Sequence, residues 1–98
     1  MMKRKEMEKI QAAGGEAVSF EINHMGVISD LDTENFTLKP GQPFKIKNDG
    51  TDAVTLEVRT SKMAEGEFIA TRIDLGWNPE NVVEIKMTSA SVTLKWGY

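Results

Sequence analysis

Histidine and cysteine, two residue types that often act as general base, nucleophile or metal ligand, are scarce in this 98-residue sequence. His24 is the only histidine, and the sequence has no cysteine. A general base at His24 would need a nucleophile and an orienting carboxylate, but no Gly-x-Ser-x-Gly elbow accompanies it. A metal site built from several histidines or thiolates is excluded. We therefore expect no catalytic residue, and we expect His24, at the end of a predicted strand, to be structural or exposed.

The acidic segment that contains Asp30, Asp32 and Glu34 is the one candidate for a metal site. Its alternating carboxylates could face one Ca²⁺ if the loop curls around the ion. An EF-hand loop would have glycine at its sixth position and glutamate at its twelfth, where Asn35 and Gly41 stand. A solvated acidic loop is the favoured interpretation and a loop-type calcium site the alternative. Paired carboxylates for glycoside cleavage are less favoured, because sequence neighbours rarely oppose each other across a substrate.

Aromatic residues form the remaining candidates. Trp77 lies in a predicted Gly/Pro-bounded loop, residues 76–80, where an indole can stack on a sugar or cover the open end of a β-domain. Trp96 and Tyr98 are two residues apart and in strand register with Leu94, so they should share its face. We expect Trp96 to lie in the core and Tyr98 to be available for an interface.

Composition excludes several classes of function. No Walker loop, Gly-x-Gly-x-x-Gly motif or zinc-ligand spacing occurs, so no cofactor is expected. The net charge of −3 argues against nucleic acid as a partner, and no apolar run approaches the ~18 residues that would suggest a membrane helix. Residues 10–15 include Gln11 and two glycines, so no apolar region follows the basic start and no signal peptide is expected.

Residues 1–15 differ from the rest of the chain in charge and pattern. Residues 3–9 hold four basic and two acidic side chains, whereas the rest of the chain holds 8 basic against 13 acidic. The composition favours a helix, but Gly14-Gly15 ends it, and a lone helix of about ten residues is marginal in water. This arm is either a frayed tail or a segment that orders on a partner. Its candidate contact residues are Lys3, Arg4, Lys5, Met7 and Ile10.

From residue 16 onward the apolar residues recur with a period of two, which is typical of strands with one buried face. The clear cases are residues 18–22, 36–38, 44–47, 54–59, 83–88 and 92–96, and the less regular ones are 25–28 and 67–73. In the segment 83–88 the pattern places Val83, Ile85 and Met87 on one face. We expect short polar turns between these strands.

Turn residues punctuate the strands. Lys39-Pro40-Gly41-Gln42 is typical of a type II turn, and Asn48-Asp49-Gly50-Thr51 predicts a hairpin that joins residues 43–47 to 53–60. Strands every 8–12 residues indicate an all-β domain over residues 16–98. The predicted fold is a single antiparallel β-sandwich of seven or eight strands, with a barrel as the alternative.

Two parts of the sequence resemble known families. Phe44-Lys45-Ile46-Lys47-Asn48-Asp49-Gly50-Thr51 followed by Val54-Thr55-Leu56-Glu57-Val58 resembles the hairpin of immunoglobulin-like β-sandwich domains. Phe68-Ile69-Ala70-Thr71, Gly76-Trp77-Asn78-Pro79-Glu80, Val83-Glu84-Ile85-Lys86 and Trp96-Gly97-Tyr98 are similar to segments of small phage and prophage proteins of gut bacteria. The resemblance implies an immunoglobulin-like virion component, such as a head-decoration or auxiliary protein, in the virion or the host cytoplasm.

These observations favour a non-enzymatic structural protein that acts through protein–protein contacts, by self-association or in a larger virion assembly. The arm residues, Trp77 and Tyr98 are its candidate contacts. The alternative is a carbohydrate- or cell-surface-binding module that uses exposed aromatic residues such as Trp77. A small β-domain hydrolase or metalloprotein is a third, less favoured hypothesis.

Overall fold

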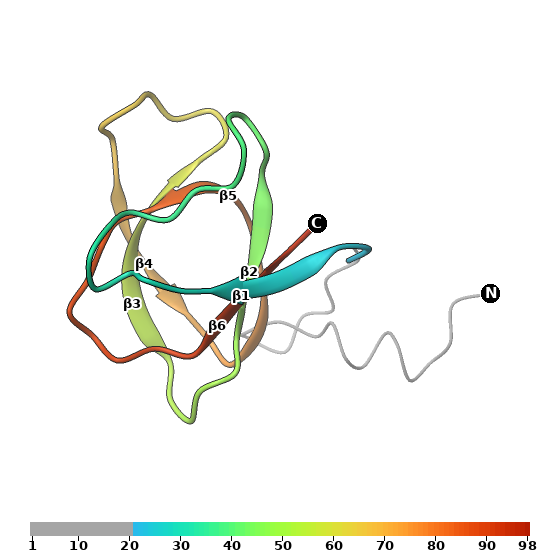
Figure 1. Ribbon diagram of the computed structural model, residues 1–98, viewed down its shortest axis with the longest axis vertical. Helices are drawn as coiled ribbons and strands as arrows, with labels where there is room; N and C mark the ends of the chain where they lie inside the picture. The colour runs from blue at the N-terminus through green and yellow to red at the C-terminus, as the bar shows by residue number, and fades with distance from the viewer. Residues whose placement is uncertain (1–20) are drawn as a thin grey trace.

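The computed structural model describes residues 21–98, which form six β-strands in a single antiparallel sheet and contain no helix (Figure 1). The strand order in the sheet is β1-β6-β2-β5-β3-β4. The strands are β1 (Met25–Ile28), β2 (Phe44–Asn48), β3 (Val54–Thr60), β4 (Ile69–Ile73), β5 (Gly76–Ile85) and β6 (Leu94–Gly97). The arm, residues 1–15, and most of the predicted strand at 18–22 lie outside the described residues.

The sheet curves around one hydrophobic core, so that its strands surround a common centre as in a barrel with an open seam (Figure 1). The two edge strands, β1 and β4, do not pair with each other. Every strand contributes to the core, and the loop after β1 adds one residue. The buried apolar side chains are Ile28, Leu31, Phe44, Ile46, Leu56, Val58, Ile73, Val82, Ile85 and Leu94.

Strict alternation in β2 and β3 produces this core. Phe44 and Ile46 are buried, whereas the side chains between them are partly exposed, and Leu56 and Val58 repeat the pattern on β3. Successive side chains of a strand point to opposite faces, so each strand buries one face and leaves the other to solvent. The all-β antiparallel prediction is confirmed. The described residues, however, form one sheet of six strands and not the expected two sheets of seven or eight.

The predicted hairpin at residues 48–51 is wrong. β2 pairs with β5 and β6, and β3 pairs with β4 and β5, so β5 lies between the two strands that the turn was expected to join. The buried Asn48 side chain explains the difference. Its Oδ1 accepts a bond from Gly50 N at 2.8 Å, and its Nδ2 donates to the carbonyls of Asp52 and Ile73 at 3.0 and 3.2 Å. The turn is therefore held against the end of β4, and the chain crosses over the end of β5.

The predicted loop at residues 76–80 is also wrong, because it forms the first half of β5. The pairing of β5 with both neighbours shifts register along its length, as β-bulges do. Pro79 lies in the irregular stretch, where its missing N–H costs no regular ladder bond. The shift also places Val82 on the buried face. Of the predicted face of Val83, Ile85 and Met87, Ile85 is buried as predicted, whereas Val83 is only partly buried and Met87 is exposed.

Of the other predicted strands, one is found as predicted and the rest have changed bounds. β1 agrees with the prediction, β4 begins two residues later, and β6 begins at Leu94 instead of residue 92. The predicted strand at 36–38 is reduced to one bridge, in which Phe36 and Ile85 exchange two backbone hydrogen bonds of 2.9 and 3.0 Å. This bridge fastens the long β1–β2 connection to the end of β5.

Candidate functional site

Trp77 lies on the convex face of the sheet, on β5 and opposite Lys47 of β2. The Lys47 Nζ is 6.0 Å from the centre of the indole ring. The ring reaches over Gly97 of β6, where an added Cβ would lie 2.6 Å from Trp77 Cη2 and 2.7 Å from Ile22 Cγ2. The indole is half-buried. Trp77 is thus part of the sheet surface, packed against the backbone of a nearby strand, and not the tip of a loop.

The C-terminal aromatic residues form a second cluster, on the face that Trp96 shares with Leu94. The rings of Trp96 and Tyr98 are stacked, with centres 5.7 Å apart and an angle of 16°. The His24 ring lies 5.2 Å from that of Trp96 and 5.4 Å from that of Tyr98. Trp96 packs against the core, in keeping with its alternation, whereas Tyr98 is 38% exposed.

Gly26 makes room for this cluster, since an added Cβ would lie 2.6 Å from Trp96 Cζ2. His24 is exposed and joined to Tyr98 by backbone bonds of 2.9 Å in both directions. Among residues 21–98 its ring has aromatic neighbours but no side-chain hydrogen bond to a hydroxyl or carboxylate. The arrangement provides stacking surface and no nucleophile–base pair.

The acidic residues of the predicted calcium loop are not brought together. Asp30 has a positive φ of 63°, and its carbonyl accepts bonds of 3.0 Å from the backbone nitrogens of Thr33 and Glu34 and from the Thr33 hydroxyl. The side chains of Asp30, Asp32 and Glu34 are exposed. In the described part of the chain no three histidine, aspartate or glutamate side chains are grouped so that they could hold a metal ion. The segment is a tight turn closed by its own backbone.

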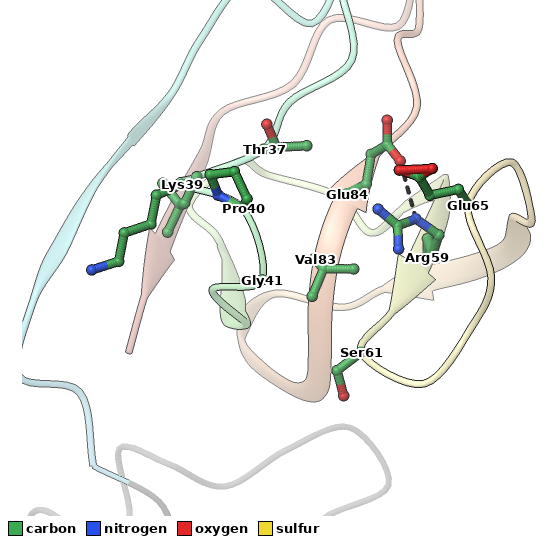
Figure 2. A pocket seen from close by; sticks show the side chains of 10 residues that line it. Thr37, Lys39, Pro40, Gly41, Arg59, Ser61, Glu65, Val83 and Glu84 are labelled. Carbon is green, nitrogen blue, oxygen red and sulfur yellow. Dashed lines mark hydrogen bonds and ion pairs between the residues drawn. The ribbon is translucent and has the colours of Figure 1, made fainter.

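A hollow of about 480 Å³, lined by both polar and apolar side chains, lies beside the Arg59–Glu84 ion pair (Figure 2). The two residues are opposite in the β3–β5 register, and Arg59 Nε is 3.1 Å from Glu84 Oε1. Asn35 Nδ2 donates to the other Glu84 oxygen at 3.0 Å, and Asn35 Oδ1 accepts from Met87 N at 2.9 Å. Figure 2 shows Lys39 extending away from the hollow.

The charge of Arg59 is therefore balanced inside the sheet surface, and the Asn35 amide joins the β1–β2 connection to β5. The contacts of Glu84 with Arg59 and Asn35 beside the hollow therefore have a structural role. Sequence reasoning missed these contacts because they depend on the register of two strands that are far apart in the chain. The signal available was the placement of Arg59 and Glu84 at polar positions of two strongly alternating segments.

Two lysine–carboxylate groups lie on the convex face. Burial lowers the pKa of Lys45, an effect partly offset by the carboxylate of Glu80, and the ammonium group donates to Asn81 Oδ1. Burial would raise the pKa of Asp49, but hydrogen bonds from Lys95 and Lys47 outweigh it, so the pKa is lowered. The ion pairs at Asp49 measure 3.2 and 3.3 Å. The ion pairs thus stabilise the charged form of Asp49, whereas burial disfavours the charged form of Lys45.

The two edges of the sheet differ in character. The edge strand β1 has the sequence Met-Gly-Val-Ile, and its Met25 and Val27 side chains are 46% and 67% exposed. The opposite edge, β4, presents the exposed cation Arg72, which pairs with Asp74 at 2.7 Å. Exposed edge strands are pairing sites unless charge, proline or a bulge protects them. β4 has such protection, and β1 has none within its four residues.

The backbone of β1 is also directed outward at these positions. His24 exchanges both backbone bonds with Tyr98, and residues of an antiparallel strand alternate between bonding inward and outward. The N–H and C=O groups of Met25 and Val27 consequently point away from β6. Sequence reasoning did not single out these two residues, because a short apolar run reads as a core strand as easily as an edge.

No helix in residues 21–98 has the length and apolar character needed to cross a membrane. The chain matches no family model, no curated protein and no solved structure.

Proposed function

We propose that this chain is a non-enzymatic structural module that acts through protein–protein contacts. The observation that carries the proposal is the uncharged edge strand β1, which offers outward backbone groups beside the exposed side chains of Met25 and Val27. The side chains that could take part in catalysis or metal binding support the same proposal. His24 contacts aromatic rings, Arg59 is bound to Glu84, and the three acidic residues at 30–34 are apart.

In its more specific form, the proposal is a virion component of the head-decoration or auxiliary type, with the basic arm at residues 1–15 as an additional contact. Support for this form comes from the phage-like segments, which include the Trp77 stretch and the C-terminal aromatic pair. In the same form the two halves of the curved sheet, β1-β6-β2 and β5-β3-β4, act as the layers of a sandwich-like domain around one core. The hairpin that carried the immunoglobulin-like part of the resemblance lends no support, since β2 and β3 do not pair.

The carbohydrate-binding alternative has less support. A sugar would stack on an open aromatic face, but the Trp77 indole is half-buried over Gly97, and the Lys47 ammonium lies near the ring. The stacked rings of Trp96 and Tyr98 likewise cover part of each other.

Particle composition tests the proposal. Particles purified from a culture that carries the gene should contain the full chain at a fixed ratio to the major shell protein, as mass spectrometry would show. Particles prepared without it should take it up when the purified chain is added. Absence of the chain from particles, together with failure to bind them, would refute the virion role.

A further inference from the structure

We infer that β1 is a self-pairing edge, which joins a second copy of this chain by antiparallel β1–β1 pairing. The inference rests on the proposed function and names its partner. A two-fold axis at Gly26 places Met25 opposite Val27 of the second copy, and Val27 opposite its Met25. These are the residues whose backbone groups point outward, so the pairing forms four N–H···O bonds.

The side chains fit the same register. Met25 and Val27 are on the convex face and are 46% and 67% exposed, so each apolar side chain meets an apolar one across the axis. On the other face Gly26 opposes Gly26 of the second copy. Directly opposed residues that do not exchange hydrogen bonds come closest together, with Cα atoms about 4.5 Å apart, and two glycines satisfy that approach without a clash.

The distribution of charge favours the β1 edge, and a second copy of this chain as its partner. The chain carries a net charge of −3, so two copies repel each other at most orientations, but residues 22–29 contain no aspartate, glutamate, lysine or arginine. Pairing two such segments brings no like charges together. The other edge is different, because a two-fold axis at Thr71 of β4 would place Arg72 of both copies diagonally on one face.

The interface is small. A standard stable complex buries about 1,600 Å², far more than four-residue strands can cover, so the isolated chain should associate weakly, with a dissociation constant of roughly 10 µM to 1 mM. Weak pairing of this kind is strengthened when copies are held together on a larger surface.

Sedimentation velocity of the full chain at concentrations up to about 1 mM tests the inference. Val27→Glu is the informative variant. Within its own sheet the new carboxylate faces Lys95, the cross-strand partner of Val27, so the fold is not penalised, whereas in the pair it opposes an apolar side chain. We expect the dissociation constant to rise about tenfold or more. The matched control is Ile69→Glu, at a 57% exposed position on β4. This variant should have a dissociation constant within about twofold of the wild-type value.

Amide hydrogen exchange gives a readout that requires no variant. Protection of the Met25 and Val27 amides should rise with protein concentration, whereas the outward amides of Ala70 and Arg72 on β4 should not change. A chain that stays monomeric throughout, or whose association survives Val27→Glu or is lost only in Ile69→Glu, overturns the inference. Presence of the chain in particles is decided by a separate experiment. Any of these three results, obtained while particle binding is retained, refutes β1 self-pairing and leaves the proposed function standing.

Discussion

Replacement of Asn78 by aspartate should destabilise the fold strongly at neutral pH and much less at acid pH. Asn78 is 4% exposed on β5. Its Nδ2 donates to the carbonyls of Ile46, Asp74 and Gly76 at 3.3, 2.9 and 3.1 Å, and its Oδ1 accepts from Asp74 N at 3.0 Å. The side chain thereby joins the β4–β5 turn to β2. Aspartate has the same shape but, when ionised, has no donor for any of the three carbonyls.

The size of the effect follows from these contacts. Loss of the two N–H donors costs about 1 kcal/mol each. A buried carboxylate that faces carbonyl oxygens adds roughly 1–2 kcal/mol. The sum is about 3–4 kcal/mol, a large part of the roughly 5–15 kcal/mol by which a domain of this size is stable.

The pH dependence has a definite sign. Burial and hydrogen bonding to the carbonyls both favour the protonated carboxyl, which can donate, so its pKa in the folded variant lies above the unfolded value of about 3.9. A raised folded-state pKa contributes stability that is present below the unfolded value and is lost as pH rises through the folded value. A rise of about 1.5 pKa units would make the deficit relative to wild type about 1.6 kcal/mol smaller at pH 4 than at pH 7.

Urea unfolding followed by tryptophan fluorescence at pH 4 to pH 8 measures this difference. Asn81→Asp is the control, because Asn81 is exposed on the same strand and its side chain accepts a bond from Lys45. The control should stay within about 0.5 kcal/mol of wild type. A deficit below about 1 kcal/mol for Asn78→Asp at pH 7, or one that does not change with pH, would refute the reasoning.

Other variants test other contacts. Gly26→Ala should cost about 1–3 kcal/mol in urea unfolding, because the new Cβ would meet the Trp96 indole at 2.6 Å, and unchanged stability would contradict that packing. The pKa of Asp49 is lowered in the folded state, so its carboxylate contributes stability at pH values above its unfolded pKa, and this contribution is lost as pH falls. Asp49→Asn should therefore lower the free energy of unfolding by about 0.5 kcal/mol at pH 7, and by less in high salt. A difference from wild type that does not change with pH would contradict this. A double-mutant cycle of Arg59→Met and Glu84→Gln, measured by thermal unfolding, should give a coupling of about 1 kcal/mol, whereas strict additivity would show that the ion pair contributes nothing.

The strands with strict alternation could be predicted from sequence, because alternating apolar and polar side chains indicate directly which face of a strand is buried. Phe44, Ile46, Leu56 and Val58 all lie where the period of two places them. The buried face of the bulged strand β5 could not be predicted in this way. Extra residues in its pairing shift that face to Val82, and the position of the shift depends on the neighbouring strands.

The hairpin prediction was wrong for a related reason. Local turn chemistry at Asn48 is compatible with a hairpin, but the Asn48 amide bonds to the carbonyl of Ile73, a residue 25 positions away, and that contact depends on the whole sheet. The candidate site shows the same division. The packing of Trp96 against the core follows from alternation, whereas the outward-facing backbone groups of Met25 and Val27 follow from strand order, which no local pattern encodes.

Strand order has a consequence for how the chain is made. Among the described strands, β3 and β4 are the only pair that are both consecutive in sequence and adjacent in the sheet. During synthesis this hairpin is the only pairing that two of the described strands can make until β5 emerges and inserts between β2 and β3. β1 has no partner strand in the sheet until β6, the last of the described strands, is complete. Non-local pairing of this kind makes folding slow and exposes unpaired strands on the way. Of the described strands, β1 therefore waits longest for its partner in the sheet during translation.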